Sequence, residues 1–141
     1  MSADIFLDSN IFIYAIDSSA PAKQSVARRV IAEKRYAIST QVLGEFYVNA
    51  TRKIPVPLDH AVAVAEANRW CQLAAVPVVP IDKSLVNAAF EIQSRWQLSY
   101  WDALVIAAAS KAACPVLLSE DLNAGETIAG VTITNPFAAL V

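Results

Sequence analysis

The residues of this sequence best suited to chemistry are five acids that stand beside short apolar segments: Asp8, Glu45, Asp102, Glu120 and Asp121. Carboxylates that converge without a cation repel by about 4 kcal/mol per pair at ~4 Å and an effective dielectric constant near 20. A cluster therefore predicts raised pKa values or a bound metal. Oxygen ligands without a usable His or Cys favour Mg²⁺ or Mn²⁺.

Each acid also has a purely structural explanation. Asp8 suits the N-cap of a following helix, although Asn10 can take that role. Asp102 complements a helix dipole, but its apolar neighbours offer a carboxylate little water. Glu45 alone is typical of a solvated helix face, and Asp121 alone is typical of a turn.

Four other reactive residues are interpreted as structural. Asp82 precedes an apolar helix and is explained as its cap. His60 is the only histidine, and its neighbours in the sequence include no ligand set. Cys71 and Cys114 have neither metal spacing nor a histidine beside them, so we expect buried free thiols.

Short apolar segments alternate with amphipathic ones along the chain. Strands are expected at residues 4–7, 36–38, 76–81, 114–118 and 131–134, with helices between them. Pro77 and Pro80 predict a sheet edge for the third strand. Continuous apolar strands indicate a parallel sheet covered on both faces, an α/β/α sandwich. Ligands of such sheets bind at the carboxyl ends of the strands, where the acids lie.

Composition limits the class of protein. The chain has 141 residues, 56% of them hydrophobic, which predicts one domain over 1–141 with a large core or a homodimer face. We expect that face around Phe12, Tyr14 and Trp70 or Trp96. The net charge of −2 disfavours a non-specific nucleic-acid binder. The first residues lack a basic signal region and no apolar run spans a bilayer, so a cytoplasmic, non-membrane location is expected.

Four segments, residues 6–15, 44–46, 99–109 and 117–125, together resemble the PIN-domain family, especially VapC-type toxin ribonucleases. The resemblance spans almost the whole chain and implies a five-stranded parallel sheet of order 3-2-1-4-5, usually in a dimer. Asp8, Glu45, Asp102 and Asp121 fall on the family's acidic positions, and Asn10 on the polar position that holds the first acid. Whether Asp121 or Glu120 faces a metal stays open.

The resemblance also implies an activity and partners. The activity is metal-dependent hydrolysis of RNA, and the partner is a small antitoxin that covers the active site. Nothing in the sequence requires the antitoxin, since stand-alone PIN nucleases match the same segments. A catalytically silent binding module and a phosphoryl-transfer protein with Asp8 as acceptor are the rival interpretations. The latter is weakened because Asn10 stands where a haloacid-dehalogenase-like motif has a second Asp.

The expected chemistry is in-line attack of a metal-bound water on a phosphodiester of single-stranded RNA. Asp8 and Asp102 would bind Mg²⁺ directly, and Asp121 directly or through water. Glu45 would orient or deprotonate the water, and a second metal can join with the phosphate. Glu45, Asn49 and Arg52 lie at i, i+4 and i+7, which predicts a helix face with Arg52 near a substrate phosphate.

Overall fold

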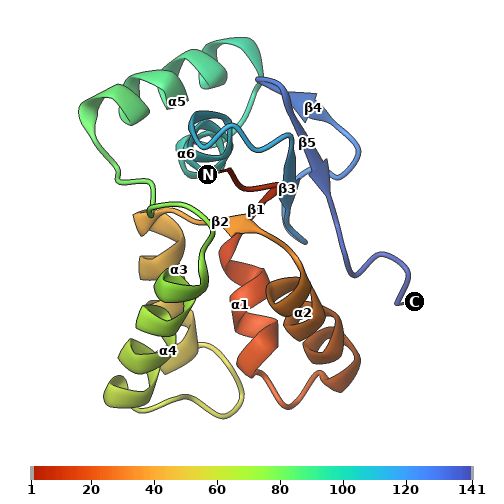
Figure 1. Cartoon of the computed structure of the whole chain (residues 1–141). Helices are drawn as coiled ribbons and strands as arrows, with labels where there is room; N and C mark the ends of the chain where they lie inside the picture. Colours follow the sequence, from red (N-terminus) through yellow and green to blue (C-terminus); the bar gives the residue numbers. More distant parts are fainter. Residues whose placement is uncertain (1, 141) are drawn as a thin grey trace.

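The computed structural model describes residues 2–140, which form six helices and five strands. The strands are β1 (Ile5–Leu7), β2 (Tyr36–Ala37), β3 (Val116–Leu118), β4 (Thr127–Ile128) and β5 (Val131–Thr134). The helices are α1 (Ser9–Ile16), α2 (Pro21–Glu33), α3 (Thr40–Arg52), α4 (His60–Leu73), α5 (Lys83–Arg95) and α6 (Tyr100–Lys111). Figure 1 shows α5 and α6 on one side of the sheet and α1 to α4 grouped on the other.

The five strands form one sheet in the order β2-β1-β3-β5-β4. β1 pairs in parallel with β2 and β3, and β3 pairs in parallel with β5. The predicted α/β class with a mostly parallel sheet is confirmed. β1 and β3 lie next to each other with Leu7 opposite Leu118, so the residues that follow them, Asp8 and Ser119, emerge at the same edge of the sheet.

Both ends of the sheet differ from the sequence prediction. Residues 76–81 form no strand and add only one parallel bridge, between Ser39 and Val79. Pro77 and Pro80 flank that bridge and cannot donate backbone hydrogen bonds, which limits the pairing. A strand that the sequence did not predict, β4, takes its place in the count of five and pairs antiparallel with β5 at the other end of the sheet. The connecting residues Ala129 and Gly130 have φ of 53° and 79°, as a tight hairpin turn requires.

Helix α6 lies at the centre of the core. Its residues from Ala103 to Ala109 are all buried, as the nearly all-apolar sequence predicts. Ser99 caps this helix by accepting a hydrogen bond from the backbone N–H of Asp102, 3.1 Å away. The cap and the burial together fix Asp102 in the first turn, beside the sheet edge. Within residues 2–140, no helix is long and apolar enough to cross a membrane.

Candidate active site

Asp8 is the most deeply buried acid of the site, with 7% of its surface exposed. It follows β1 and is the N-cap of α1, in extended backbone conformation. Its Oδ1 accepts a hydrogen bond from the N–H of Ser9 at 2.8 Å, and its Oδ2 accepts one from the hydroxyl of Ser119 at 2.7 Å. The capping role considered for Asp8 is therefore real, and it fixes the orientation of the carboxylate.

The electrostatic surroundings of Asp8 favour its protonated form. Burial is the main cause that raises its pKa, and the negative charges of Asp121 and Asp102 raise it further. The hydrogen bonds from Ser119 and Ser9 oppose this effect only in part. A buried carboxylate near two like charges is costly to ionise, and a cation is the usual compensation.

Glu45, in the middle of α3, belongs to the same group of charges. Burial raises its pKa most, the charge of Asp8 adds to the shift, and Asp102 contributes more weakly. Hydrogen bonding to Gln41 and Ser9 lowers the pKa by less. We refer to Asp8, Glu45, Asp102 and Asp121 as the acidic cluster, because the structure places all four close enough to couple through Asp8.

Asp121 is held in the cluster by Asn10. The Nδ2 of Asn10 donates to Asp121 Oδ2 at 3.1 Å and to the Ser119 hydroxyl at 3.3 Å. The Oδ1 of Asn10 accepts from the backbone N–H of Glu120 at 3.3 Å. Asn10, which was expected to hold Asp8, therefore reaches Asp8 only through Ser119 and acts directly on the turn after β3.

Ser119 is the residue that sequence reasoning missed. It is fully buried, donates to Asp8 and accepts from the backbone N–H of Asp121 at 3.2 Å. It joins the ends of β1 and β3. The signal for it was positional, because Ser119 follows β3 as Asp8 follows β1, and neighbouring parallel strands bring such residues together.

Glu120 is paired with other side chains, although it lines the same hollow as Asp121. Its Oε1 accepts from the Tyr14 hydroxyl at 2.6 Å, and its Oε2 pairs with Lys23 Nζ at 2.5 Å. Partial burial raises the pKa of Glu120, but the hydrogen bonds from Lys23 and Tyr14 and the charge of Lys23 lower it more. Between the two neighbouring acids, the geometry therefore favours Asp121 as the one that faces a metal.

The donor set of the acidic cluster fits a hard divalent cation. Among residues 2–140, none of its carboxylates has a Lys, Arg or His within salt-bridge distance. In the same described range, no three Asp, Glu, His or Cys side chains stand close enough to share one ion. Three of these side chains could share one ion only after they turn toward one another. Oxygen ligands with uncompensated charge are what Mg²⁺ and Mn²⁺ bind in proteins.

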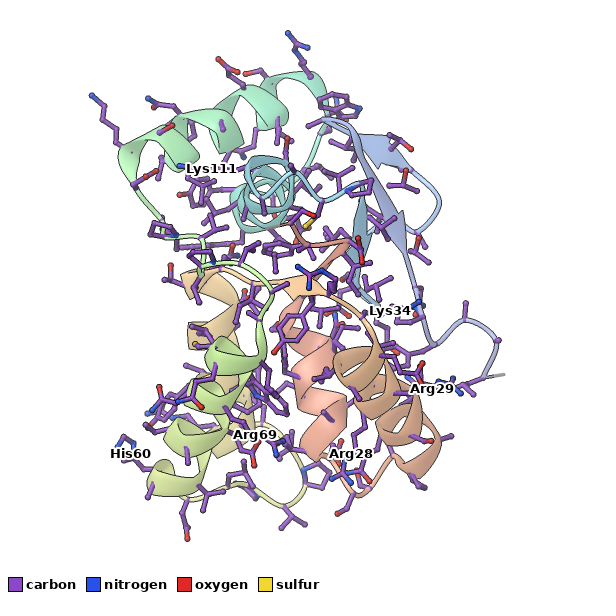
Figure 2. All side chains as sticks on the ribbon, viewed as in Figure 1. Arg28, Arg29, Lys34, His60, Arg69 and Lys111 are labelled. Carbon is purple, nitrogen blue, oxygen red and sulfur yellow. The ribbon has the colours of Figure 1, made fainter. Side chains whose placement is uncertain are left out.

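The residues interpreted as structural are placed accordingly. Asp82 caps α5 through the N–H of Leu85 at 2.8 Å and pairs with Lys111 at 3.4 Å. His60 lies at the exposed start of α4 (Figure 2), where its Nδ1 is 2.8 Å from the Tyr47 hydroxyl. Cys71 and Cys114 are free thiols, half-buried and buried respectively.

Two pockets flank the acidic cluster along α3. The α3–α6 pocket has a volume of about 540 Å³ and includes Glu45 and Trp101 in its lining. The α1–α3 pocket has a volume of about 290 Å³ and includes Asn10 and Asp121. Asn49 and Lys53 line both. Arg52, the expected phosphate ligand, is exposed and lines neither of them, so Lys53 is the basic side chain nearer the acids.

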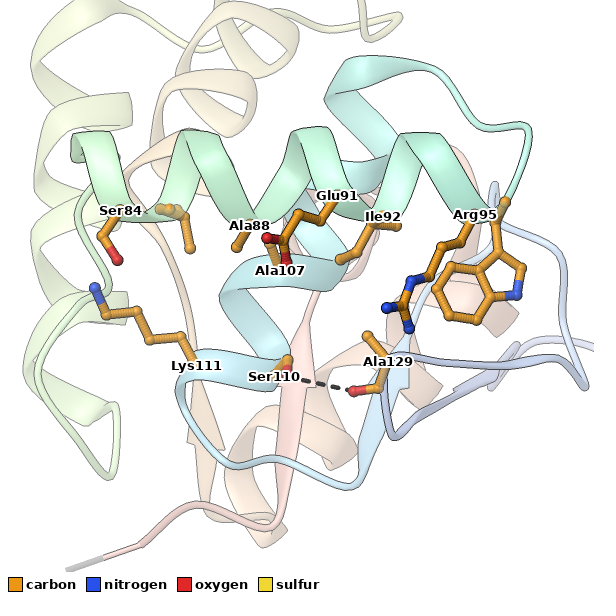
Figure 3. A pocket seen from close by; sticks show the side chains of 11 residues that line it. Ser84, Ala88, Glu91, Ile92, Arg95, Ala107, Ser110, Lys111 and Ala129 are labelled. Atoms are coloured by element: carbon orange, nitrogen blue, oxygen red, sulfur yellow. Dashed lines mark hydrogen bonds between the residues drawn. The ribbon is translucent and has the colours of Figure 1, made fainter.

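The other hollows lie elsewhere. Figure 3 shows a pocket between α5 and the end of α6, lined by Arg95, Lys111 and Glu91 above an apolar floor and containing no member of the acidic cluster. A basic groove lies between α2 and α4, where Figure 2 labels Arg28 and Arg69. Arg28 there donates to the Ala15 carbonyl at 2.8 Å, and Arg69 pairs with Glu66.

The expected dimer face is wrong in two of its members. Phe12 is fully buried and Trp70 is 3% exposed, because their rings pack together with centroids 5.2 Å apart inside the core of one chain. Tyr14 is half-buried and bound to Glu120, and Trp96 lines the pocket of Figure 3. The apolar face of an amphipathic helix packs against the core of its own chain, so these two residues leave no surface for a second copy.

Known proteins share both the sequence pattern and the fold. The family model of the PIN domain matches residues 5–127. Mycobacterium tuberculosis VapC20, a toxin that cleaves the sarcin-ricin loop, is 26% identical, with 80% of this chain and 86% of that chain covered and a TM-score of 0.61.

Two further solved structures share the fold at lower identity. VapBC2 from Rickettsia felis, bound to promoter DNA, is 14% identical over 93% and 97% of the two chains, with a TM-score of 0.65. A toxin-antitoxin complex from Klebsiella pneumoniae is 18% identical over 94% and 97%, with a TM-score of 0.62. No curated protein sequence matches the chain.

Proposed function

This chain belongs to the PIN-domain family, as its motifs predicted, and from that premise we propose that it is a divalent-metal-dependent endoribonuclease and the toxin of a toxin-antitoxin pair. One observation carries the proposal. Buried Asp8 is coupled to three further carboxylates, and within residues 2–140 no basic side chain pairs with any of them. A stable protein keeps such a charge cluster where a cation is to be bound.

The roles of the side chains follow from their surroundings. Asp8, Asp102 and Asp121 would hold Mg²⁺ or Mn²⁺, which when bound supplies Lewis-acid activation of water and offsets the charge of a phosphodiester. Ser119 and Ser9 fix Asp8, and Asn10 fixes Asp121. The raised pKa of Glu45 brings it closer to neutral pH, as a general base that accepts a proton from the attacking water requires.

RNA is the proposed substrate, hydrolysed at a phosphodiester bond. Support comes from VapC20, the only one of the three compared structures above a quarter identity. The pockets on both sides of the cluster offer room for nucleotides, and Lys53 between them offers a cation for a phosphate. Arg52, at the end of α3, stays a prediction as a second phosphate contact.

We also propose the remaining organisation of the protein. One contiguous core from Ala3 to Phe137 supports a single nuclease domain over 1–141. The Klebsiella pneumoniae complex supports a small antitoxin as partner. A homodimer through exposed apolar residues and a cytoplasmic location complete the proposal. Sedimentation at micromolar concentration that gives only a 15.2 kDa species would refute the dimer.

Cleavage of single-stranded RNA by the purified protein tests the function. We expect cleavage with Mg²⁺ or Mn²⁺, none with EDTA, and none from Asp8→Asn under any condition. Cleavage that persists in EDTA would refute the metal dependence, and equal cleavage by Asp8→Asn would exclude Asp8 as a metal ligand. Binding of RNA without cleavage in every metal would favour the silent binding module.

Induced expression in a bacterial host tests the toxin role. Growth arrest by the wild type and normal growth with Asp8→Asn would support a toxin whose effect depends on cleavage. Cleavage in vitro without growth arrest would instead favour a stand-alone PIN nuclease.

A further inference from the structure

The α3–α6 pocket is an open hollow of the surface with the volume and the mixed lining of a ligand site. Its volume of about 540 Å³ lies in the range of small-molecule pockets. Its walls combine the exposed apolar residues Val48, Ile81 and Trp101 with the polar side chains of Gln41 and Asn49. Glu45 of the acidic cluster also lines it, so a ligand there would lie beside the site of the chemistry.

Trp101 supplies an aromatic surface at the mouth of this pocket. It is 59% exposed, although it directly precedes Asp102 in the buried helix α6. Gln41 Nε2 donates to the Trp101 carbonyl at 3.1 Å, and the Tyr100 ring packs at a centroid distance of 4.9 Å. Exposed aromatic rings are the surfaces on which unpaired bases of single-stranded nucleic acids stack.

Gln41 adds a hydrogen-bonding group that the protein leaves unsatisfied. The side chain lines the pocket and is 7% exposed, yet its buried Oε1 has no hydrogen-bond partner among the described residues. A buried acceptor without a partner is unfavourable unless a ligand or water completes it. The base edge of a nucleotide carries N–H donors that could do so once the Gln41 side chain turns its Oε1 toward the pocket.

Gly44 keeps the pocket open at a cost to helix α3. A Cβ at this position would meet no other atom within 4 Å, so no packing requires glycine. Glycine in the interior of a helix is nevertheless less stable than alanine. The absent side chain leaves free volume in the lining of the pocket, directly beside Glu45.

From these observations we propose that the α3–α6 pocket binds one unpaired nucleobase of the RNA substrate. The base stacks on Trp101 and is joined to a phosphate that Lys53 contacts next to the acidic cluster, and a turn of the Gln41 side chain toward the pocket would let Oε1 accept from the base edge. This inference rests on the proposed ribonuclease function and extends it to substrate recognition.

Binding to single-stranded RNA separates this inference from catalysis. Fluorescence anisotropy with a labelled mixed-sequence oligonucleotide of about 12 nucleotides, in EDTA and in the Asp8→Asn background, reports binding alone. We expect Trp101→Leu to weaken binding about tenfold or more, and Trp101→Phe to retain most of it because phenylalanine still stacks. Val62→Ala is the control, at an apolar residue that is 46% exposed on α4 and lies outside the pocket.

Gly44→Ala gives a second test with opposite signs for stability and binding. The methyl group should raise the melting temperature by about 3–5 °C because alanine favours the helix. It should also weaken RNA binding several-fold because it occupies the pocket. A merely structural glycine would change stability without changing affinity.

Lys53→Ala and Arg52→Ala, compared at two salt concentrations, test the phosphate contact. We expect Lys53→Ala to lower the salt dependence by roughly one phosphate contact, and Arg52→Ala to lower it less.

RNA binding by Trp101→Leu and Gly44→Ala that equals the Asp8→Asn parent would overturn the inference, even if the wild type cleaves RNA. Failure of the parent itself to bind RNA would overturn it as well. Weaker binding by these variants supports the pocket even if the wild type fails to cleave, in which case only the proposed function falls.

Discussion

The acidic cluster and the carboxylate of Glu120 meet at the end of β3, and they differ in their charged partners. The acidic cluster contains Asp121 and has no basic partner among residues 2–140. Its neighbour in sequence, Glu120, is held by Lys23 and Tyr14. The pKa of Asp8 in the cluster is raised, mainly by burial, whereas the pKa of Glu120 is lowered because its two donors outweigh partial burial.

The difference separates a structural acid from a functional one. Glu120 is satisfied within the chain, so its charge contributes to the fold and needs nothing else. Asp8 retains an unfavourable charge that only an added cation or a proton relieves. A charge that the protein itself leaves uncompensated therefore indicates function better than the presence of an acid in a turn.

Substitutions in the acidic cluster should have the largest effect, a loss of RNA cleavage in Asp8→Asn and in Asp102→Asn. Each should lower the RNA cleavage rate by about 100-fold or more, because the metal loses a charged ligand. Neither should lose thermal stability, since removal of one clustered charge relieves repulsion. Cleavage assays and thermal melts check both points, and a wild-type rate in either variant would exclude that residue as a ligand.

Metal binding should stabilise the folded protein through the acidic cluster and not through Glu120. At a concentration about 100 times its dissociation constant, Mg²⁺ should add about 2.7 kcal/mol to the free energy of unfolding of the wild type. Asp8→Asn should gain much less, and Glu120→Gln should gain as much as the wild type. Thermal melts with and without Mg²⁺ measure the difference, and equal stabilisation of all three proteins would contradict a metal site at Asp8.

The contributions of the acidic cluster and of Glu120 to the free energy of unfolding should also change with pH in opposite directions. Asp8 and Glu45 have raised pKa values in the folded state, mainly through burial, so the folded metal-free protein binds more protons than the unfolded chain. Stability should therefore fall as pH rises from about 4 through these raised values. The fall should be smaller in Asp8→Asn. Urea melts in EDTA across this range test the sign, and a rise in wild-type stability would contradict it.

The smallest effect should come from Glu120→Gln. Its ion pair with Lys23 is partly exposed, so we expect a loss of about 0.5–1 kcal/mol at neutral pH and near-normal RNA cleavage. Because the pKa of Glu120 is lowered in the folded state, this contribution is present above about pH 4 and is lost as pH falls through the lowered value. Glu126→Gln, at an exposed acid, is the control in urea melts. A large loss of cleavage in Glu120→Gln would show that Glu120 belongs to the functional site.

Local sequence determined most of the elements and several residues at their ends, with the absent strand at 76–81 and the added β4 as the exceptions. Ser39, Asp82 and Ser99 cap α3, α5 and α6 as their side chains and positions predict. The apolar run of α6 determined its burial, and the alternation of strand and helix determined a mostly parallel sheet. Acids that follow β1 and β3 were bound to lie at one edge of that sheet, so the candidate site was predictable from capping, periodicity and position alone.

Tertiary structure alone decided which neighbouring side chain faces which partner. Glu120 and Asp121 are neighbours in sequence, and the turn after β3, fixed by Asn10 and Ser119, gives them different hydrogen-bond partners. Lys53, at a spacing of four residues from Asn49 and eight from Glu45, lines the pocket with both, whereas Arg52 as a phosphate contact stays a prediction. Phe12 and Trp70 are buried in the core because the ring of Phe12 on α1 packs against the ring of Trp70 on α4. Such choices depend on contacts between residues far apart in sequence, which no local pattern encodes.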